Sequence, residues 1–225
     1  MDTSVETDAL VRLVAISRPA DDACSSPGEL IAYCARVSNP GNQANTETAP
    51  RLLRYLVRNA HWSPLEMASM TVEINTTRDI ARQILRHRSF SFQEFSQRYA
   101  EVGAAEPVVR EARLQHETNR QASVELPPES PHHEQWALDQ RVVWDVARKH
   151  YEWALQRGVA KEVARALLPE GLTRSRLYMA GTLRSWVHYV QLRTEAGTQK
   201  EHREIAEACK AVLLEQVPEL AEVLS

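Results

Sequence analysis

The first part of the chain shows apolar and polar segments that predict one strand and two helices. Residues 9–17 are apolar and rich in branched side chains, which favours a β-strand although the alternation is weak. Pro27 opens a segment with apolar positions three and four apart, and this helical spacing ends before the Asn-Pro-Gly sequence at 39–41. Thr48 precedes a proline and another amphipathic run, so we expect a second helix to about residue 59.

The middle of the chain carries a second strand pattern, and the rest of the chain is mainly helical in pattern. Bulky side chains alternate in residues 67–77, as they do in a half-buried strand. A helix is expected directly after it, from Thr77 or Asp79 through Leu85. Beyond residue 134 the apolar positions again have helical spacing. This spacing predicts helices over residues 136–157, 161–168, 175–194 and 199–215.

A polar stretch, residues 101–130, separates these parts; it has few large apolar side chains and prolines near its end. Segments of this kind are loops or connections between structural units, and we expect this one to be the most mobile part of the chain. Otherwise the chain is predicted to form one domain over residues 1–225. The order strand, helices, strand and then mostly helices predicts an α+β fold and not a regular βαβ winding.

Composition narrows the classes of function. With 43% hydrophobic and 25% charged residues, the 225-residue chain is typical of an ordinary soluble globular protein. Its net charge of -3 and pI near 6.3 argue against a general nucleic-acid binder, which needs a broadly basic surface. Any site for an anion must therefore be local.

Cysteine usage and the first residues favour a reduced, cytoplasmic protein. Cys24, Cys34 and Cys209 have neither metal-site nor disulfide-framework spacing, and Met1 begins a polar acidic stretch without a basic-then-apolar signal segment. No apolar run approaches the about 20 residues that cross a bilayer, so we expect no membrane role. The eight histidines include no H-E-x-x-H motif, and we expect no metal.

Residues 86–99 concentrate the side chains that carry chemistry. Arg86-His87-Arg88 ends a predicted helix, and Ser, Phe, Gln and Glu side chains follow up to Arg98 and Tyr99. One interpretation is structural, with cations complementing the helix dipole and phenylalanines in the core. The other is a site for an anionic planar ligand such as a flavin or a nucleotide, because guanidinium groups bind phosphate bidentately and stack on rings. A single-stranded nucleic-acid-binding module that uses the Arg/Phe-rich loop is the alternative function.

This segment resembles the signature of the flavin-dependent thymidylate synthases, which is Arg-His-Arg, seven further residues and Ser. Arg86-His87-Arg88 and Ser96 match the signature at every defined position. Further blocks that resemble this family, spread over residues 9–215, are Ala81-Arg82-Gln83, Ser96-Gln97-Arg98-Tyr99, His61-Trp62-Ser63-Pro64-Leu65-Glu66, Glu162-Val163-Ala164-Arg165 through Leu168-Pro169, and Leu183-Arg184-Ser185-Trp186-Val187-His188-Tyr189 with Leu192-Arg193.

The resemblance implies both a fold and an activity. The fold is the family's thymidylate synthase-complementing fold, an α+β single domain with a small antiparallel-type sheet and predominantly helical packing. The activity is methylation of dUMP to dTMP, with 5,10-methylenetetrahydrofolate as one-carbon donor and FAD, reduced by NADPH, as hydride carrier; tetrahydrofolate is released. The family forms homotetramers with shared active sites, and we expect the same here.

The resemblance also implies two sets of binding residues. Those for dUMP are Gln83, Ile84, Leu85, Arg86, Glu94, Phe95, Ser96, Gln97, Arg98, Arg165 and Arg193. Those for FAD are Ser63, Arg86, His87, Arg88, Glu94, Thr182, Leu183, Arg184 and His188, with His61 and Glu66 nearby. We expect Arg98 and the loop amides at the dUMP phosphate, and Arg88 and Arg184 at the FAD pyrophosphate, where a planar fork fits better than a lysine.

Arg193 is the implied catalytic residue. It matches the family arginine that polarises the pyrimidine and favours its N3-ionised form, because attack by uracil C5 on a one-carbon unit places charge on the ring oxygens and N3. None of the three cysteines neighbours the signature, which fits a flavin route without an enzyme cysteine. The chain has no G-x-G-x-x-G motif, so side chains must hold the flavin.

The chain departs from the family pattern in two places. Met67 follows Glu66 where the family often has histidine, and we interpret this as a packing change because methionine fills irregular apolar space. Residues 195–203 differ from the H-A-D-x-E-I-R-like run of many members, and no ligand role is assigned to them.

Overall fold

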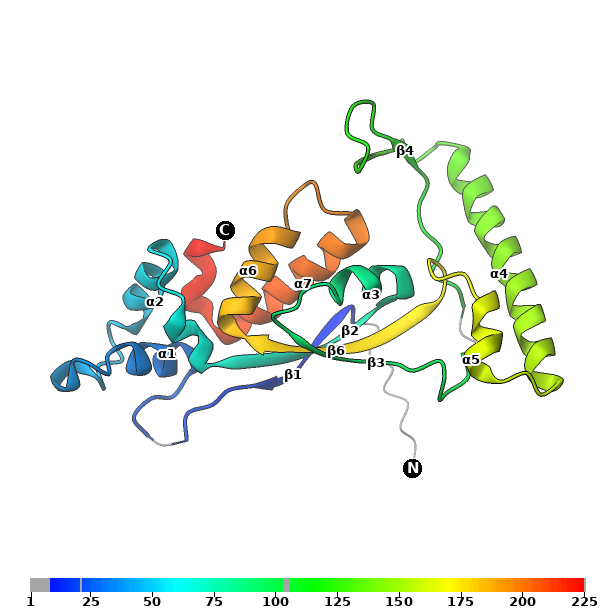
Figure 1. Ribbon diagram of the computed structural model, residues 1–225. Helices are drawn as coiled ribbons and strands as arrows, with labels where there is room; N and C mark the ends of the chain where they lie inside the picture. Colours follow the sequence, from blue (N-terminus) through cyan, green and yellow to red (C-terminus); the bar gives the residue numbers. More distant parts are fainter. Residues whose placement is uncertain (1–8, 21, 103–105, 225) are drawn as a thin grey trace.

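A four-stranded antiparallel sheet with strand order β1-β2-β6-β3 forms the centre of the molecule (Figure 1). The structure is a computed structural model that describes residues 9–20, 22–102 and 106–224. The strands of the sheet are β1 (Val11–Ile16), β2 (Ser69–Thr77), β3 (Ser91–Glu94) and β6 (Arg174–Thr182). The α+β fold with a small antiparallel sheet is therefore confirmed.

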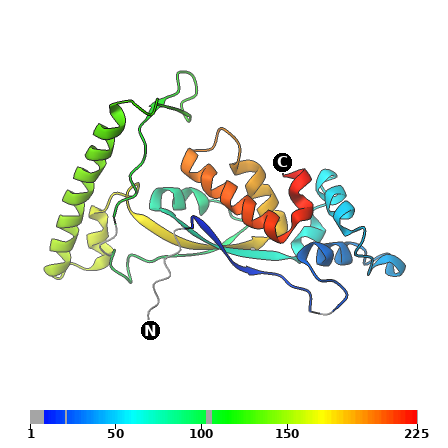
Figure 2. The ribbon, with the colours of Figure 1, turned by 180° about the vertical axis from the view of Figure 1, so that it is seen from behind.

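Helices cover one face and one end of this sheet (Figures 1 and 2). Over the face lie α3 (Arg78–Ile84), α6 (Leu183–Arg193) and α7 (Lys200–Gln216), which we call the helical layer. At the end lie α1 (Pro27–Ala35), α2 (Ala49–Arg58) and the short 3-10 turns η1 (Pro40–Asn42), η2 (Ser63–Met67) and η4 (Pro218–Val223). No helix in the described parts of the chain is long and apolar enough to span a bilayer.

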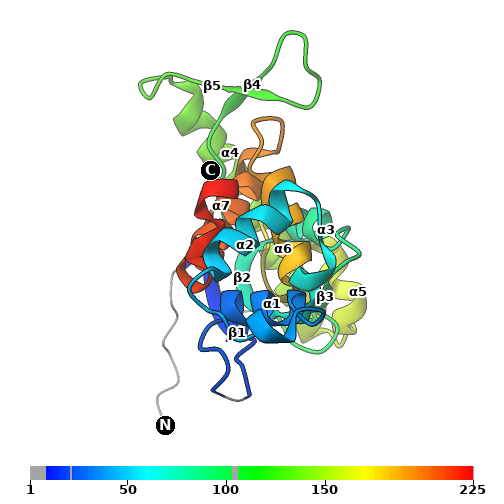
Figure 3. The same cartoon turned by 90° about the vertical axis from the view of Figure 1, so that its left-hand side faces the viewer.

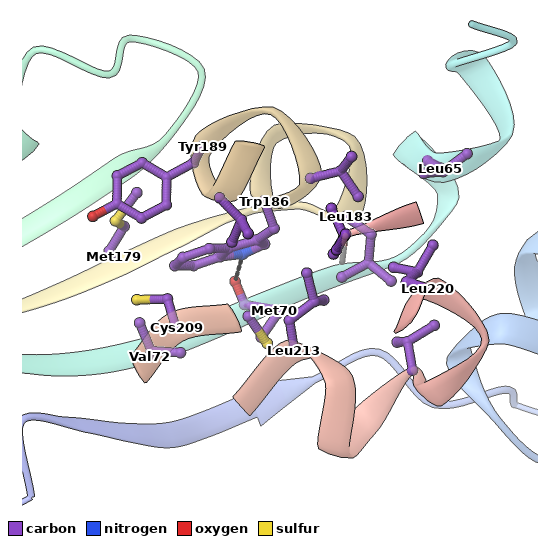
Figure 4. Packing of buried hydrophobic residues seen from close by; sticks show 14 of the residues in the cluster. Leu65, Met70, Val72, Met179, Leu183, Trp186, Tyr189, Cys209, Leu213 and Leu220 are labelled. Carbon is purple, nitrogen blue, oxygen red and sulfur yellow. Dashed lines mark hydrogen bonds between the residues drawn. The ribbon is translucent and has the colours of Figure 1, made fainter. Parts of the chain in front are cut away.

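The main core lies between the sheet and the helical layer. Val72 of β2 is paired with Met179 of β6, and both side chains are completely buried on the helical side. Strand geometry sends alternate side chains to opposite faces, so every second residue of β2 and β6 contributes to this core. Trp186 of α6 packs on the two strands and donates its indole N–H to the carbonyl of Met70 at 3.0 Å (Figure 4).

A close contact between Phe90 and Gly181 fixes the loop that follows the Arg-His-Arg sequence. A Cβ atom added at Gly181 would lie 2.4 Å from the ring of Phe90, so a larger residue does not fit there. The same phenyl ring contacts the indole of Trp186 edge-on, with 4.8 Å between the ring centroids. The signature loop is thereby held against β6 and α6.

One predicted helix is partly wrong. Residues 175–194 were expected to form a single helix, but 174–182 form strand β6, and helix α6 begins only at Leu183. Buried and exposed side chains alternate along most of β6, which is the period of a strand. Helical spacing starts at the Thr182 cap, whose hydroxyl accepts a hydrogen bond from the backbone N–H of Ser185 at 3.4 Å.

Strand β3 was missed because its four residues are too few to show a period, and they were expected to be loop. The remaining expected strands and helices are confirmed with shifts of a few residues at their ends. The helix expected over 161–168 is a short helix, α5 (Lys161–Ala164), that continues into the 3-10 turn η3 (Arg165–Leu167).

An arm, defined as residues 106–168, extends away from the helical layer (Figures 1 and 3). It consists of the hairpin β4 (Arg113–Gln115) and β5 (Ser123–Glu125), the 25-residue helix α4 (His132–Gln156), α5 and η3. The hairpin lies within the stretch 101–130 that was expected to be a loop or connection. A second, smaller core holds the arm together through Trp144, Tyr151, Ala154, Ala164 and Leu168.

Candidate active site

The central feature of the site is a contact between an arginine and a histidine. Arg193, the last residue of α6, donates its Nε–H to Nε2 of His87, which follows α3, at 2.9 Å. Burial, and after it the charge of Arg193, lowers the pKa of His87 to about 4. At neutral pH the imidazole is therefore uncharged, with Nε2 as the acceptor and the remaining proton on Nδ1.

A second histidine lies beneath the first. His202 of α7 is completely buried; its Nε2 lies 3.2 Å from the hydroxyl of Tyr189, and its Nδ1 lies 3.4 Å from Oε1 of Gln83. Burial, followed by the charge of Arg193 and the neighbouring His87, lowers the pKa of His202 to about 4. Burial also raises the pKa of Tyr189. These buried groups are thus neutral near pH 7.

Gln83 joins this cluster to the first turn of α7. Its Nε2 donates to Oε1 of Gln199 at 2.7 Å, and Nε2 of Gln199 donates to Oε2 of Glu201 at 2.9 Å. Burial raises the pKa of Glu201, but its own backbone amide, Gln199 and Arg113 together outweigh burial, and the pKa is lowered. We call Gln83, His87, Tyr189, Arg193 and His202 the central group.

Glu94 lies at the end of β3, opposite Leu177 of β6. Its carboxylate accepts a hydrogen bond from Ser175 Oγ at 2.8 Å, forms an ion pair with Arg82 and lies 3.6 Å from Arg78. The side chain is only 15% exposed, so these partners hold one orientation of the carboxylate.

Arg98 and Arg165 both contact Glu162, and we call these three residues the arginine group. Arg98 Nε lies 3.5 Å from the carboxylate of Glu162, and Arg165 donates its Nε–H to the backbone carbonyl of the same residue at 3.2 Å. The Arg98 side chain is 68% exposed. The neighbouring Gln97 is buried, and its Nε2 has no hydrogen-bond partner among the described residues.

A third set, the η2 group, gathers where η2 meets the start of α6. Its members are Ser63, Glu66, Thr182, Arg184 and His188. Arg184 forms an ion pair with Glu66, and the ring of His188 meets Trp62 edge-on at a centroid distance of 4.4 Å. Burial, and after it the charge of Arg184, lowers the pKa of His188.

The structure therefore brings the expected site residues together in separate groups. The arginine group lies beside the start of β6 and the η2 group at its end. The nine-residue strand β6 lies between them and is itself roughly 30 Å long, at about 3.3 Å per residue. Ile84 and Leu183 are completely buried, so only their backbone can contact a ligand. The other expected residues, which are half-buried or exposed, include Leu85, Arg86, Arg88, Phe95, Ser96 and His61.

Four residues in or next to the central group were absent from the expected sets. Tyr189 and His202 belong to the group, and Gln199 and Glu201 are linked to it through Gln83. His202 carried a signal in the sequence, because it belongs to the buried stripe of α7 together with Ile205, Ala206, Cys209 and Leu213. A histidine in an apolar stripe must find hydrogen-bond partners in the fold. No group of three or more His, Cys, Asp or Glu side chains suited to a metal occurs among the described residues.

Comparison with known proteins agrees with this arrangement. The family model described as thymidylate synthase complementing protein matches residues 22–219. A flavin-dependent thymidylate synthase of Synechocystis sp. is 48% identical over 218 residues, which cover 95% of this chain and 98% of that protein. A probable flavin-dependent thymidylate synthase of Paramecium bursaria Chlorella virus 1 is 46% identical over 213 residues, which cover 95% and 97%.

A solved structure shows the same fold. The UMP/dUMP methylase PolB from Streptomyces cacaoi, bound with 5-Br dUMP, superposes with a TM-score of 0.79 at 31% identity, over 94% of this chain and 92% of that chain. The family expected from the Arg-His-Arg signature is confirmed: the chain belongs to the thymidylate synthase complementing protein family, with relatives named flavin-dependent thymidylate synthase.

Proposed function

We propose that this protein is a flavin-dependent thymidylate synthase. It converts dUMP to dTMP with 5,10-methylenetetrahydrofolate as one-carbon donor, FAD as hydride carrier and NADPH as reductant. The contact of Arg193 with the neutral His87 carries the proposal, because it holds the arginine implied to polarise uracil against a residue of the signature. Two relatives that bear this enzyme's name, at 46% and 48% identity over nearly the whole chain, support the same reaction.

Arg193 has the position that charge stabilisation on a pyrimidine requires. Its Nε–H is used by His87, and the two Nη groups of the guanidinium remain as further donors. Those groups are suited to a pyrimidine edge, where negative charge develops on the oxygens and N3 when C5 attacks the one-carbon unit. His87 with a pKa of about 4 holds no second positive charge near neutral pH, so it positions Arg193 without repelling it.

The arginine group is suited to the phosphate of dUMP. Among the described residues Arg98 forms one ion pair, with Glu162; both side chains are exposed, and such pairs are weak enough for a phosphate to replace. Arg165 is bonded to the backbone carbonyl of Glu162, and the buried Nε2 of Gln97, which has no partner among the described residues, is a further donor. Two guanidinium forks and an amide supply the planar, bidentate contacts that phosphate favours.

The η2 group fits FAD by its chemistry. Thr182 caps the start of α6, an eleven-residue helix whose first N–H groups favour an anion. Arg184 and the exposed Arg88 would hold the pyrophosphate, and the Trp62–His188 pair offers an aromatic edge to a flat ring. FAD bound there would supply the hydride that completes the methyl group. Cys209 is completely buried and burial raises the pKa of its thiol, so it is not suited to act as a nucleophile.

We further propose a homotetramer with shared active sites. The arginine and η2 groups of one chain lie at opposite ends of β6, whereas one site must hold both dUMP and FAD. Helix α4 also presents exposed apolar side chains, each 45–54% exposed, namely Trp136, Leu138, Val142, Val143, Val146 and Trp153. Apolar surface of this extent is typical of an interface between subunits.

Mixed oligomers test the shared site. Arg98→Ala and Arg193→Ala are each expected to be inactive, because each variant damages every site of its own oligomer. Co-expressed mixtures should form dTMP clearly above either parent, since some sites then draw both intact elements from different chains. If mixed oligomers form but stay as inactive as the parents, both residues act within one subunit.

The absorption spectrum tests the proposed function itself. The purified protein, reconstituted with FAD and desalted, is expected to be yellow with flavin bands that dUMP perturbs. With NADPH and 5,10-methylenetetrahydrofolate it should form dTMP. A protein that stays colourless after reconstitution, or that binds single-stranded oligonucleotides in a salt-sensitive manner without flavin, would contradict the proposal and favour a nucleic-acid-binding module.

A further inference from the structure

A continuous chain of hydrogen bonds runs from the first turn of α7 to the middle of α6 and passes through Gln83. Its members, in order, are Glu201, Gln199, Gln83, His202 and Tyr189. The four links measure 2.9, 2.7, 3.4 and 3.2 Å. Only Gln83 belongs to the residues implied to contact dUMP, and three of the others lie in the segment 195–203 that departs from the family pattern.

Glu201 ends this series of hydrogen bonds, and its chemistry fixes which group donates and which accepts at every link. Glu201 is ionised, because its pKa is lowered, and a carboxylate only accepts hydrogen bonds. Gln199 must therefore turn its NH₂ toward Glu201 and its oxygen toward Gln83, which donates its own NH₂ in return. This leaves Gln83 Oε1 facing His202.

The tautomer of His202 follows from the same logic. Because Gln83 Oε1 can only accept, Nδ1 of His202 must carry the proton and Nε2 must accept from the hydroxyl of Tyr189. Ion pairs anchor the carboxylate end: Glu201 pairs with Arg113, and Arg110 Nε lies 3.9 Å away. One charged residue thus sets the donor and acceptor roles of four neutral side chains.

We infer that His202 is a positioning residue for the nucleotide: together with Gln199 and Glu201 it locks the side-chain amide of Gln83 in one orientation. One N–H and one oxygen lone pair of Gln83 then remain for the ligand in fixed places. A flipped amide would set oxygen against oxygen at Gln199 and N–H against N–H at His202, so flipping loses two hydrogen bonds. This inference rests on the proposed function and deepens it, since it assigns a role to a segment that the signature leaves without one.

The ordinary interpretation of a buried histidine is that it merely fills the core. Such a role predicts a loss of stability that affects every ligand equally. A positioning role predicts instead that dUMP binding weakens while FAD binding does not, because Gln83 is the residue that loses its orientation. The two roles are therefore separable by measuring both ligands on the same variants.

The test uses the FAD-loaded protein and dUMP as the probe. His202→Leu removes both hydrogen bonds of the ring and is expected to raise the Kd for dUMP on the order of tenfold, with unchanged FAD content. His202→Asn restores an N–H near the position of Nδ1 and should recover most of the affinity. Tyr189→Phe removes only the last hydrogen bond of the series, between the Tyr189 hydroxyl and His202, and should weaken dUMP binding less than His202→Leu does.

Thr194→Val is the matched control. It removes a partly buried hydroxyl that donates to the carbonyl of Val190 at 2.9 Å. Thr194 lies beside Arg193 but takes no part in the series of hydrogen bonds through Gln83, so the variant should leave the Kd for dUMP within about twofold. A thermodynamic cycle gives the decisive comparison: in a Gln83→Leu background, His202→Leu should have no further effect on dUMP binding.

Gln199→Leu, at a half-buried position, provides a second route if His202→Leu does not fold, and it should also raise the Kd for dUMP. The inference is overturned if His202→Leu, or Gln199→Leu in its place, leaves the Kd within twofold. The inference is also overturned if the effects of His202→Leu and Gln83→Leu on dUMP binding are fully additive. Equal losses of dUMP affinity and FAD affinity in the His202→Leu variant would overturn it as well. A wild-type protein that binds neither FAD nor dUMP would instead overturn the proposed function.

Discussion

The central group buries polar side chains, whereas the arm exposes apolar ones. In the central group, His202 is completely buried and His87 and Gln83 are half-buried. Nε2 of His87, both ring nitrogens of His202 and the side-chain amide of Gln83 have hydrogen-bond partners within the same chain. In the arm, α4 leaves tryptophan and valine side chains half exposed, and the buried indole N–H of Trp144 has no partner among the described residues.

This difference separates chemistry from assembly. Buried polar groups are tolerated only when they are hydrogen-bonded, so the central group is complete as a structure in one chain. Exposed apolar surface favours burial against a partner, and we therefore propose that the arm packs against another subunit. Disturbing the central group should therefore affect the reaction or the stability of one chain, whereas disturbing the arm should affect association.

The largest expected effect comes from the central group. Arg193→Ala should lower kcat by about 100- to 1000-fold, the loss typical of removing one preorganised donor to developing charge. FAD binding should persist, and Arg193→Lys should recover only part of the rate, because lysine lacks the fork. Steady-state dTMP formation with a parallel flavin spectrum measures this. Near-normal turnover by Arg193→Ala would remove Arg193 from the chemistry.

The second largest expected effect is a loss of folding stability at acid pH, caused by the central group. The pKa of His202 is lowered from 6.5 to about 4 in the folded protein, so in this window the unfolded chain binds more protons and stability falls as the pH falls. A shift of this size corresponds to about 3 kcal/mol. Urea unfolding measures the unfolding free energy at pH 7 and at pH 4. Between these two pH values, His202→Asn should lose less of it than the wild type does, by about this amount. An equal loss in both proteins would mean that His202 is already charged in the folded state.

The arm should respond through assembly. Val142→Glu combined with Val146→Glu places two charges on the exposed face of α4 and should shift the oligomer to smaller species, with dTMP formation reduced on the order of tenfold at low protein concentration. Lys149→Glu changes the net charge of the same helix by the same amount at an exposed polar position, and it should leave the oligomer intact. Sedimentation and circular dichroism distinguish dissociation from unfolding; unchanged assembly in the double variant would exclude this face from the interface.

The smallest expected effect concerns the η2 group. Arg184 and Glu66 are 42% and 41% exposed, and an ion pair at this exposure contributes at most about 1 kcal/mol. Glu66→Gln should therefore change the unfolding free energy without ligand by less than this amount, as judged by urea unfolding. A loss of several kcal/mol would show that this pair resembles the buried contacts of the central group.

Local signals account for the parts of the fold that the sequence predicted correctly. The helices that begin at Ala49 and Lys200 and the strands β1 and β2 each show their own period over enough residues to be recognised. Strand β6 was misassigned because it leads directly into α6 without a turn, so two periods merged into one apolar stretch. Strand β3 exists only because β6 provides its hydrogen bonds.

The sequence by itself determined the family, because the signature and its flanking blocks are identities that need no knowledge of contacts. Only the tertiary structure decided which residues meet. Arg193 lies 106 positions after His87, and His202 lies 119 positions after Gln83, so no local period can report these contacts. They depend on how α3, α6 and α7 pack over the sheet, and this packing also takes both histidines out of water and keeps them neutral.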